Sequence, residues 1–355
     1  MRRLCLGLCL LLACGDDDLP TLDASSSDAG RDGGSATPDA EPPTLDAATP
    51  TEDGSFPTTD AGTDAASPSG APVWVGVGNW GYRTSTRDGV SWTTVLNPQQ
   101  ASDHSPDLLR DVSVGGGVVI AVGGDRNSMV MRSTDGASWE EDLHPAGRQW
   151  LGGVAYGEGR WVAGGGVGTT VTSTDGGRTW SDGARTPSAV RDVAFGGGLF
   201  VAVGDGGMIA TTTDASEWTD RRREGAVTLS TVSFHAGLWI AAGSNWNGSG
   251  FDTNCFLSND TETWRACPFE SRVRSTFVAD GTLYVALDDG HAWTRDGATW
   301  TTETLDLPNN GVYAEDGLWV GAGGDRRYAG ESLDALSTTT GERGLRAFAF
   351  GHLAP

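Results

Sequence analysis

Lysine is absent from the 355-residue chain, so all 24 basic residues are arginine. This excludes reactions that need a lysine nucleophile and phosphate-binding loops that need a lysine. Positive charge is scarce overall, because 47 acidic residues give a net charge of -23. A chain of this charge repels nucleic acid, so we predict no nucleic-acid partner. The sequence also contains no pattern for a cofactor or a metal ion, and we expect neither.

Long hydrophobic runs are missing, apart from one at the start of the chain. Residues 1–13 contain two arginines and an apolar run from Leu4 to Leu12, which is typical of a signal peptide and too short to span a membrane. The following Leu11-Leu12-Ala13-Cys14 resembles a bacterial lipobox, which predicts lipidation of Cys14. The alternative is ordinary signal cleavage beside an incidental cysteine. Lipidation would anchor the exported protein in the bacterial cell envelope, at the outer membrane or cell surface, through its lipid alone.

Large apolar residues are rare in residues 14–72. This segment is built from Asp, Ala, Thr, Ser, Pro and Gly, and its 13 acidic residues face a single basic one, Arg31. It cannot bury enough apolar surface to offset the entropy of ordering, so we predict a disordered tether that carries the lipidated cysteine at its start. No spacing of its acids resembles a calcium-binding loop.

Cysteine is also scarce, with five in the chain. Cys5 and Cys9 belong to the signal peptide. Cys255 and Cys267 flank a predicted hairpin turn, and pairing them gives a regular antiparallel register, which predicts a structural disulfide. A zinc site, the alternative, has no further ligands nearby.

Residues 73–355 are dominated by a motif that recurs six times. The copies read STRDGVSW (85–92), STDGASW (133–139), STDGGRTW (173–180), TTDASEW (212–218), SNDTETW (258–264) and TRDGATW (294–300). Their tryptophans are spaced by 47, 41, 38, 46 and 36 residues. This period, without helical stripes, predicts an all-β repeat fold.

The repeat that ends at Trp218 is the clearest. Residues 190–195, 199–203 and 208–211 read as strands separated by glycine turns, and Trp218 opens a fourth strand. Four antiparallel strands in about 40 residues are typical of a β-propeller blade. We therefore predict a β-propeller of four-stranded antiparallel blades.

Seven blades are expected, with six or eight as alternatives. A seventh unit at 309–343 keeps its second strand, but its motif has decayed. The first unit lacks an inner strand, and residues 345–351 match residues 190–196. The C-terminal strand would therefore complete the first blade and close the ring, which removes exposed sheet edges.

Each copy of the motif has residues suited to a tight turn. Short polar side chains accept hydrogen bonds from turn amides, glycine adopts positive φ, and the tryptophan packs between blades. The structural residues are Asp88, Asp135, Asp175, Asp214, Asp260, Asp296, Trp92, Trp139, Trp180, Trp218, Trp264 and Trp300.

The motif resembles the Asp box, or BNR repeat, of sialidase-like propellers. The resemblance implies a propeller fold, with the motif on the face opposite the active site. Sialidases also carry a Phe/Tyr-Arg-Ile-Pro motif, for which the nearest string here, Tyr82-Arg83-Thr84-Ser85, lacks Ile-Pro. No Tyr–Glu nucleophile pair is evident, so we assign no catalytic residue. Photosystem assembly factors, sortilin-type receptors and xyloglucanase-like enzymes have similar motifs, and the motif alone does not choose among them.

Candidate ligand-binding residues lie at the other end of the blades. Arg110, Arg191, Arg274 and Arg346 occupy matching positions at the start of the inner strand, and salt bridges to Asp111 or Asp192 are their alternative role. The expected loops between second and third strands add Trp80, Tyr82, Arg126, Asn127, Trp246, Arg326, Arg327 and Tyr328. Such residues suit a glycan or a protein partner.

The functional prediction is a monomeric, lipid-anchored cell-envelope protein whose propeller is a binding module for a glycan or a protein. The alternative is a glycoside hydrolase of the sialidase-like type, which would need two facing carboxylates.

Overall fold

The computed structural model divides the chain into two units, residues 1–56 and 57–355. It describes residues 70–95, 108–125, 127–143 and 149–353. The predicted signal peptide, Cys14, residues 15–69 of the tether and Arg126 lie outside the described residues. In the described part, no helix is long and apolar enough to cross a membrane.

Five sheets have four antiparallel strands each, taken in chain order. The first contains β4 (Leu109–Gly115), β5 (Val118–Gly123), β6 (Met129–Ser133) and β7 (Glu140–Leu143). The second contains β8 (Leu151–Gly157), β9 (Arg160–Gly165), β10 (Thr170–Ser173) and β11 (Ser181–Asp182). The third contains β12 (Val190–Gly196), β13 (Leu199–Gly204), β14 (Met208–Thr212) and β15 (Thr219–Asp220). The fourth contains β16 (Thr231–His235), β17 (Leu238–Trp246), β18 (Phe251–Ser258) and β19 (Arg265–Ala266). The fifth contains β20 (Val273–Ala279), β21 (Thr282–Leu287), β22 (Gly290–Thr294) and β23 (Thr301–Glu303).

The sixth sheet has six strands and joins the two ends of the repeat region. In spatial order it contains β24 (Val312–Glu315), β25 (Leu318–Gly330), β26 (Ser337–Leu353), β1 (Ala71–Gly78), β2 (Arg83–Thr86) and β3 (Thr93–Val95). Short 3₁₀ turns are η1 (Asn79–Gly81), η2 (Gly166–Gly168), η3 (Asp205–Gly207) and η4 (Leu333–Ala335). The 17 residues of β26 form one continuous strand, whose first half pairs with β25 and whose second half pairs with β1. The described residues therefore form six sheets, not seven separate blades, because one strand serves both ends.

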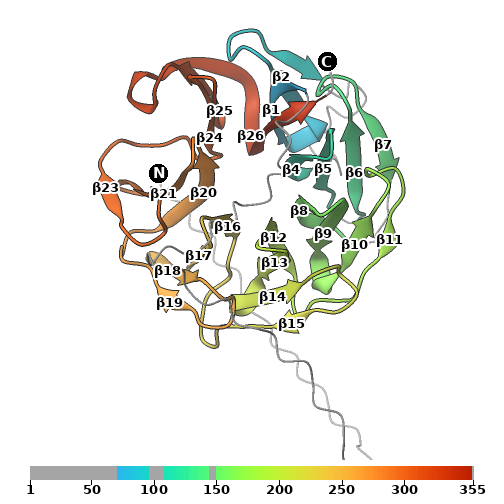
Figure 1. The fold of residues 1–355 in the computed structure, drawn as a ribbon, viewed down its shortest axis with the longest axis vertical. Helices are drawn as coiled ribbons and strands as arrows, with labels where there is room; N and C mark the ends of the chain where they lie inside the picture. The colour runs from blue at the N-terminus through green and yellow to red at the C-terminus, as the bar shows by residue number, and fades with distance from the viewer. Residues whose placement is uncertain (1–69, 96–107, 126, 144–148, 354–355) are drawn as a thin grey trace, which may run out of the picture. The chain divides into compact units, whose positions relative to one another are not determined.

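The sheets radiate from a common centre (Figure 1), with β4, β8, β12, β16 and β20 innermost and β7, β11, β15, β19 and β23 at the rim. The four-stranded antiparallel blades predicted from the repeat that ends at Trp218 are confirmed in the third sheet. The second strands are buried on both faces, as in Val118–Gly123, because each sheet is covered by a neighbour on either side.

Close approach of the inner strands depends on glycine at their ends. A Cβ on Gly157 at the end of β8 would collide with the ring of Phe195 at the end of β12. In the next pair of sheets, a Cβ on Gly196 at the end of β12 would likewise collide with the ring of Phe234. A larger residue at either position would require the neighbouring inner strand or its phenylalanine to move.

The repeated motifs form the turns between third and fourth strands. In the third copy, Asp175 Oδ1 accepts hydrogen bonds from the amides of Arg178 at 3.0 Å and Thr179 at 2.9 Å, and Ser173 Oγ donates to it at 2.8 Å. The indole of Trp180 donates to Gly177 O at 3.2 Å. Each of the six tryptophans also packs on an apolar cluster: Trp92, Trp139, Trp180, Trp218, Trp264 and Trp300. The motif therefore serves both the turn and the core.

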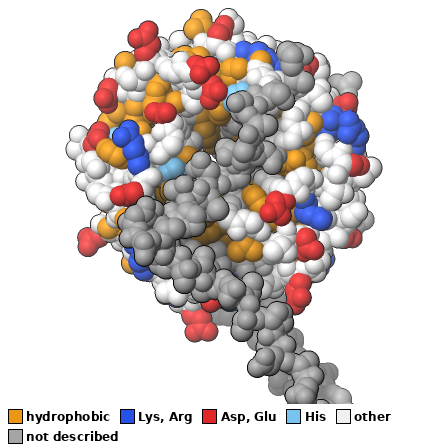
Figure 2. Space-filling model, in the orientation of Figure 1, with side chains coloured by type: hydrophobic (Ala, Val, Ile, Leu, Met, Phe, Trp, Pro, Cys, Tyr) orange, Lys and Arg blue, Asp and Glu red, His pale blue; other side chains and the backbone are white. Residues whose placement is uncertain are grey.

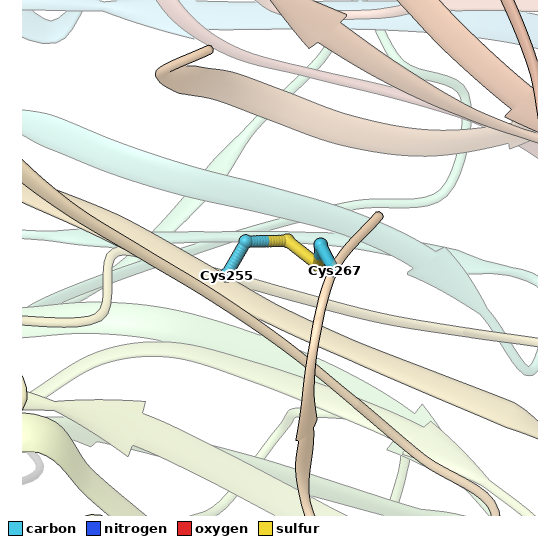
Figure 3. Close-up of a disulfide and its surroundings, with 2 residues drawn as sticks. All are labelled: Cys255 and Cys267. Carbon is cyan, nitrogen blue, oxygen red and sulfur yellow. A yellow bond between two sulfur atoms is a disulfide. The ribbon is translucent and has the colours of Figure 1, made fainter. Parts of the chain in front are cut away.

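A disulfide links Cys255 of β18 to Cys267, next to β19 (Figure 3), with 5.4 Å between the Cα atoms. The amide of Cys267 donates to the carbonyl of Cys255 at 3.0 Å, so the bridge joins two directly paired positions. It closes the hairpin that carries the fifth copy of the motif.

Candidate binding site

Four arginines at matching positions of the inner strands line one cavity of about 300 Å³. They are Arg110 in β4, Arg191 in β12, Arg274 in β20 and Arg346 in β26. Serine and threonine side chains of the inner strands, with Tyr313 of β24, add to its wall. Because the inner strands surround one centre, the same position in each repeat faces the same opening. The structure thus brings together four residues from distant parts of the chain.

Two of the four arginines are held by carboxylates. Arg191 donates to Asp205 from Nε at 2.7 Å and from Nη2 at 3.1 Å. Arg274 forms an ion pair with Asp306. These partners lie in turns at the same end of the blades, and their charges offset those of the two guanidinium groups.

The other two arginines, Arg110 and Arg346, form no ion pair with any described residue. Arg110 Nε donates to Gly124 O at 3.2 Å, and Arg346 Nε donates to Asn79 Oδ1 at 2.5 Å. Burial, followed by the charges of Arg346 and Arg191, lowers the pKa of Arg110. The charge of Asp125 acts in the opposite direction but does not cancel this effect. Repulsion among the guanidinium groups therefore favours a negatively charged group at the cavity mouth.

Trp150, just before β8, lies between two of the arginines. The guanidinium carbons of Arg110 and Arg191 are each 4.9 Å from its ring centroid. The second sheet has Gly152 in β8 where the first and third sheets have arginine, and a Cβ there would lie 2.9 Å from the Trp150 ring. Sequence reasoning missed Trp150, although the glycine that breaks the arginine pattern was the available signal.

Asp111 and Asp192 do not pair with the arginines, contrary to the alternative considered from the sequence. Each accepts a hydrogen bond from the amide of the next residue at 2.8 Å. Their second oxygens accept from the neighbouring inner strand, Asp111 from Val154 N and Asp192 from Val232 N, both at 2.8 Å. The two carboxyl groups therefore tie adjacent sheets together at the cavity wall.

The environment of these carboxyl groups disfavours their charge. Burial raises the pKa of Asp192 to about 7. Burial, followed by repulsion from Asp192, raises the pKa of Asp111 well above its usual range. The hydrogen bonds from backbone amides act in the opposite direction but do not cancel these effects.

Two residues expected on exposed loops are buried. Tyr82 is 1 % exposed and Arg327 is 3 % exposed. Arg327 Nη2 lies 3.3 Å from Tyr82 Oη, and the guanidinium carbon is 5.5 Å from the centroid of Trp92. The expected loop at 325–328 belongs to β25, whose pairing with β26 turns Arg327 inward. Because both side chains are buried, neither is placed to bind a ligand at the surface.

The other expected loop residues differ in exposure. Trp80 in η1 and Tyr328 in β25 are half-buried, while Asn127 and Arg326 are exposed. Trp246, at the end of β17, is 61 % exposed. Most of the expected loop at 244–254 is in fact the end of β17 and the start of β18. None of these side chains lines the arginine cavity.

In the described part of the chain, no group of three or more His, Cys, Asp or Glu side chains is placed to hold a metal ion. On the uncovered part of the face in Figure 2, scattered acidic side chains outnumber the arginines that lie among them. That face shows no continuous field of one sign.

Comparisons with known proteins establish the fold alone. No family model matches the chain, and no curated protein matches it. Among solved structures, YCF48 bound to a D1 peptide has a TM-score of 0.50 at 17% identity, covering 70% of this chain and 93% of that chain. YCF48 from Cyanidioschyzon merolae has a TM-score of 0.51 at 17% identity, covering 68% and 87%. The Pan2 WD40 domain of Neurospora crassa has a TM-score of 0.54 at 13% identity, covering 77% and 87%. The chain is therefore similar in fold to β-propellers.

Proposed function

We propose that the propeller is a binding module whose ligand site is the cavity lined by Arg110, Arg191, Arg274 and Arg346. The observation that carries the proposal is the convergence of these four side chains, two of which form no ion pair with a described residue. The ligand is a protein or a glycan with a negatively charged group. In support, one of the similar propellers, YCF48, was solved with a bound peptide.

The test compares ligands and variants of the full chain. Immobilised acidic peptides and acidic glycans are the probes, and binding is expected to weaken as salt is raised. The double variant Arg110→Ala, Arg346→Ala is expected to lose at least about tenfold in affinity. Arg178→Ala, which removes an exposed arginine from a turn at the other end of the blades, is the matched control and keeps full affinity. Equal loss in the control and the double variant would overturn the proposal.

The alternative, a glycoside hydrolase, needs two carboxyl groups free to act on the substrate. Asp111 and Asp192 line the cavity, but both oxygens of each accept backbone amides. This favours a bracing role over catalysis. Hydrolysis of fluorogenic sialosides or of a glycoside panel by the full chain, abolished in Asp192→Asn, would reverse that preference.

The six-stranded sheet serves, in this proposal, as two blades of a closed seven-bladed ring built from Asp-box repeats. Val320 and Ala322 of β25 pack on Trp74 of β1 and on Phe348 of β26, as neighbouring blades do elsewhere. Tyr313 Oη also donates to Phe348 O at 3.2 Å. Seven apolar clusters lie in the described residues, which matches seven contacts between blades.

The proposal places this module on the bacterial cell envelope, held by a lipid on Cys14. The support is the sequence Leu11-Leu12-Ala13-Cys14 after an apolar run. Radiolabelled palmitate fed to the expressing cells is expected to label the wild-type chain and not Cys14→Ser. Labelling of both chains would place the lipid elsewhere, and labelling of neither would remove it.

A further inference from the structure

A second cavity, of about 310 Å³, lies beside the arginine cavity. It is lined by Ser230, Ser244, Arg272, Val273, Arg274 and Asn309. Ser230, Arg274 and Asn309 line both cavities. Its wall comes from two neighbouring sheets, since Ser244 belongs to β17 and Val273 begins β20.

An exposed aromatic pair stands at the tip of the β17–β18 hairpin. Trp246 is 61 % exposed and Phe251 is 47 % exposed, and their ring centroids are 5.1 Å apart in an edge-to-face arrangement. Exposure of two large aromatic rings side by side is unusual unless a partner covers them. Trp246 is therefore a candidate stacking surface.

The turn that carries this pair is held by its own hydrogen bonds. Asn247 Oδ1 accepts from the amides of Ser249 at 3.0 Å and Gly250 at 2.9 Å. Asn247 Nδ2 donates to Asp252 Oδ1 at 2.9 Å, across the hairpin. A turn fixed in this way presents the rings in one orientation, which lowers the entropy lost when a ligand binds.

The aromatic pair and the second cavity lie on the same side of the hairpin. Side chains two residues apart on a strand share a face, so Ser244 and Trp246 face the same way. Trp246 is paired with Phe251 in the register, and paired residues also share a face. Arg272, which lines the cavity, has its guanidinium carbon 4.1 Å from the Phe251 ring centroid.

The charges around this second cavity are balanced. Arg272 donates to both oxygens of Asp288 at 2.9 Å, and Arg274 is paired with Asp306. Hydrogen bonding to Arg272 lowers the pKa of Asp288, so the carboxylate stays charged at neutral pH. Two cations facing two carboxylates do not select an anion, in contrast to the arginine cavity next to it.

We infer that this second cavity binds a neutral sugar residue. The apolar C–H face of a pyranose ring stacks on Trp246, and its hydroxyl groups bond to Ser244, Asn309 and the fixed guanidinium of Arg272. A volume of this size is at the lower end of ligand pockets, which span about 300–1,000 Å³, and suits a single ring. The inference rests on the proposed binding function and makes the ligand a glycan, with a neutral residue here and a charged group at the arginines.

The test is binding of the full chain to an array of neutral oligosaccharides, followed by calorimetry with the tightest of them. Trp246→Ala is expected to weaken that affinity by about tenfold or more, because it removes the stacking surface. Trp246→Phe keeps a ring and is expected to stay within about threefold. Val90→Ala, which truncates a 79 % exposed apolar side chain in a turn at the other end of the blades, is the matched control and leaves affinity unchanged. Unchanged thermal midpoints show that each variant is folded.

Failure of every neutral glycan to bind would overturn the inference, as would full affinity in Trp246→Ala. Binding of a peptide, instead of any glycan, at Trp246 would also overturn it. Acidic ligands that still bind through Arg110 and Arg346 would leave the proposed function standing in each of these cases.

Discussion

Replacement of Asp192 by asparagine is expected to change how stability depends on pH. In the folded chain Asp192 has its pKa raised to about 7, whereas its value without these surroundings is 3.8. Between these pH values the folded state therefore binds a proton that the unfolded state has released. The free energy of unfolding falls as pH rises through this window, and the contribution of Asp192 is fully present only below about pH 4.

The size of the effect follows from the shift in pKa. One pKa unit corresponds to about 1.4 kcal/mol, so the contribution of Asp192 changes by about 4 kcal/mol over its complete titration. About 3 kcal/mol of this change falls between pH 4.5 and pH 7.5. Asparagine does not titrate and has no such slope. Loss of the Asp192 charge also removes one of the two causes that raise the pKa of Asp111, which further flattens the profile of the variant.

Urea unfolding followed by tryptophan fluorescence, at four pH values from 4.5 to 7.5, measures this difference. Wild type is expected to lose stability relative to Asp192→Asn as pH rises. Asp175→Asn is the control, because hydrogen bonds from Thr179 lower the pKa of Asp175 and its titration is complete below this range. Parallel curves for wild type and Asp192→Asn would show that the carboxylate is charged throughout, and the argument from burial would be wrong.

Three further outcomes concern the hairpins. Replacing Cys255 and Cys267 by serine opens a loop with a sequence separation of 12 and is expected to lower the free energy of unfolding by about 3 kcal/mol in urea titrations. An unchanged free energy of unfolding would mean that the disulfide does not stabilise the fold. Trp264→Ala removes a 5 % exposed ring and is expected to cost about 3–5 kcal/mol in the same titration. Asp175→Ala is expected to lower the thermal midpoint while acidic ligands bind unchanged, and a loss of affinity at an unchanged midpoint would contradict its role in the turn.

The candidate site was only partly predictable. The repeat pattern placed Arg110, Arg191, Arg274 and Arg346 at one strand position, and the structure shows them around one cavity. Their partners were not readable, because Asp205 and Asp306 belong to turns whose position depends on the packed sheets. Trp150 precedes its strand, and its contacts with Arg110 and Arg191 depend on how neighbouring sheets pack.

The sequence by itself determined the antiparallel strands, the turn motifs and the pairing of Cys255 with Cys267. These features depend on partners close in the sequence, such as the two cysteines with a separation of 12, or on alternation along a single strand, so the physics that specifies them is local. Asp175 and the amides it accepts from are an example, since they lie within four residues of one another.

Tertiary structure alone decided how the ends of the repeat region meet and which side chains reach solvent. One continuous β26 joins β25 to β1, because sheet pairing can bridge any separation along the chain. In the sequence, Tyr82 and Arg327 look like ligand-binding residues on the surface. In the structure they contact each other in the interior, although they are 245 residues apart. Burial and pairing across such separations are set by how the sheets pack, so the choice between ligand contact and core contact was made only in the folded molecule.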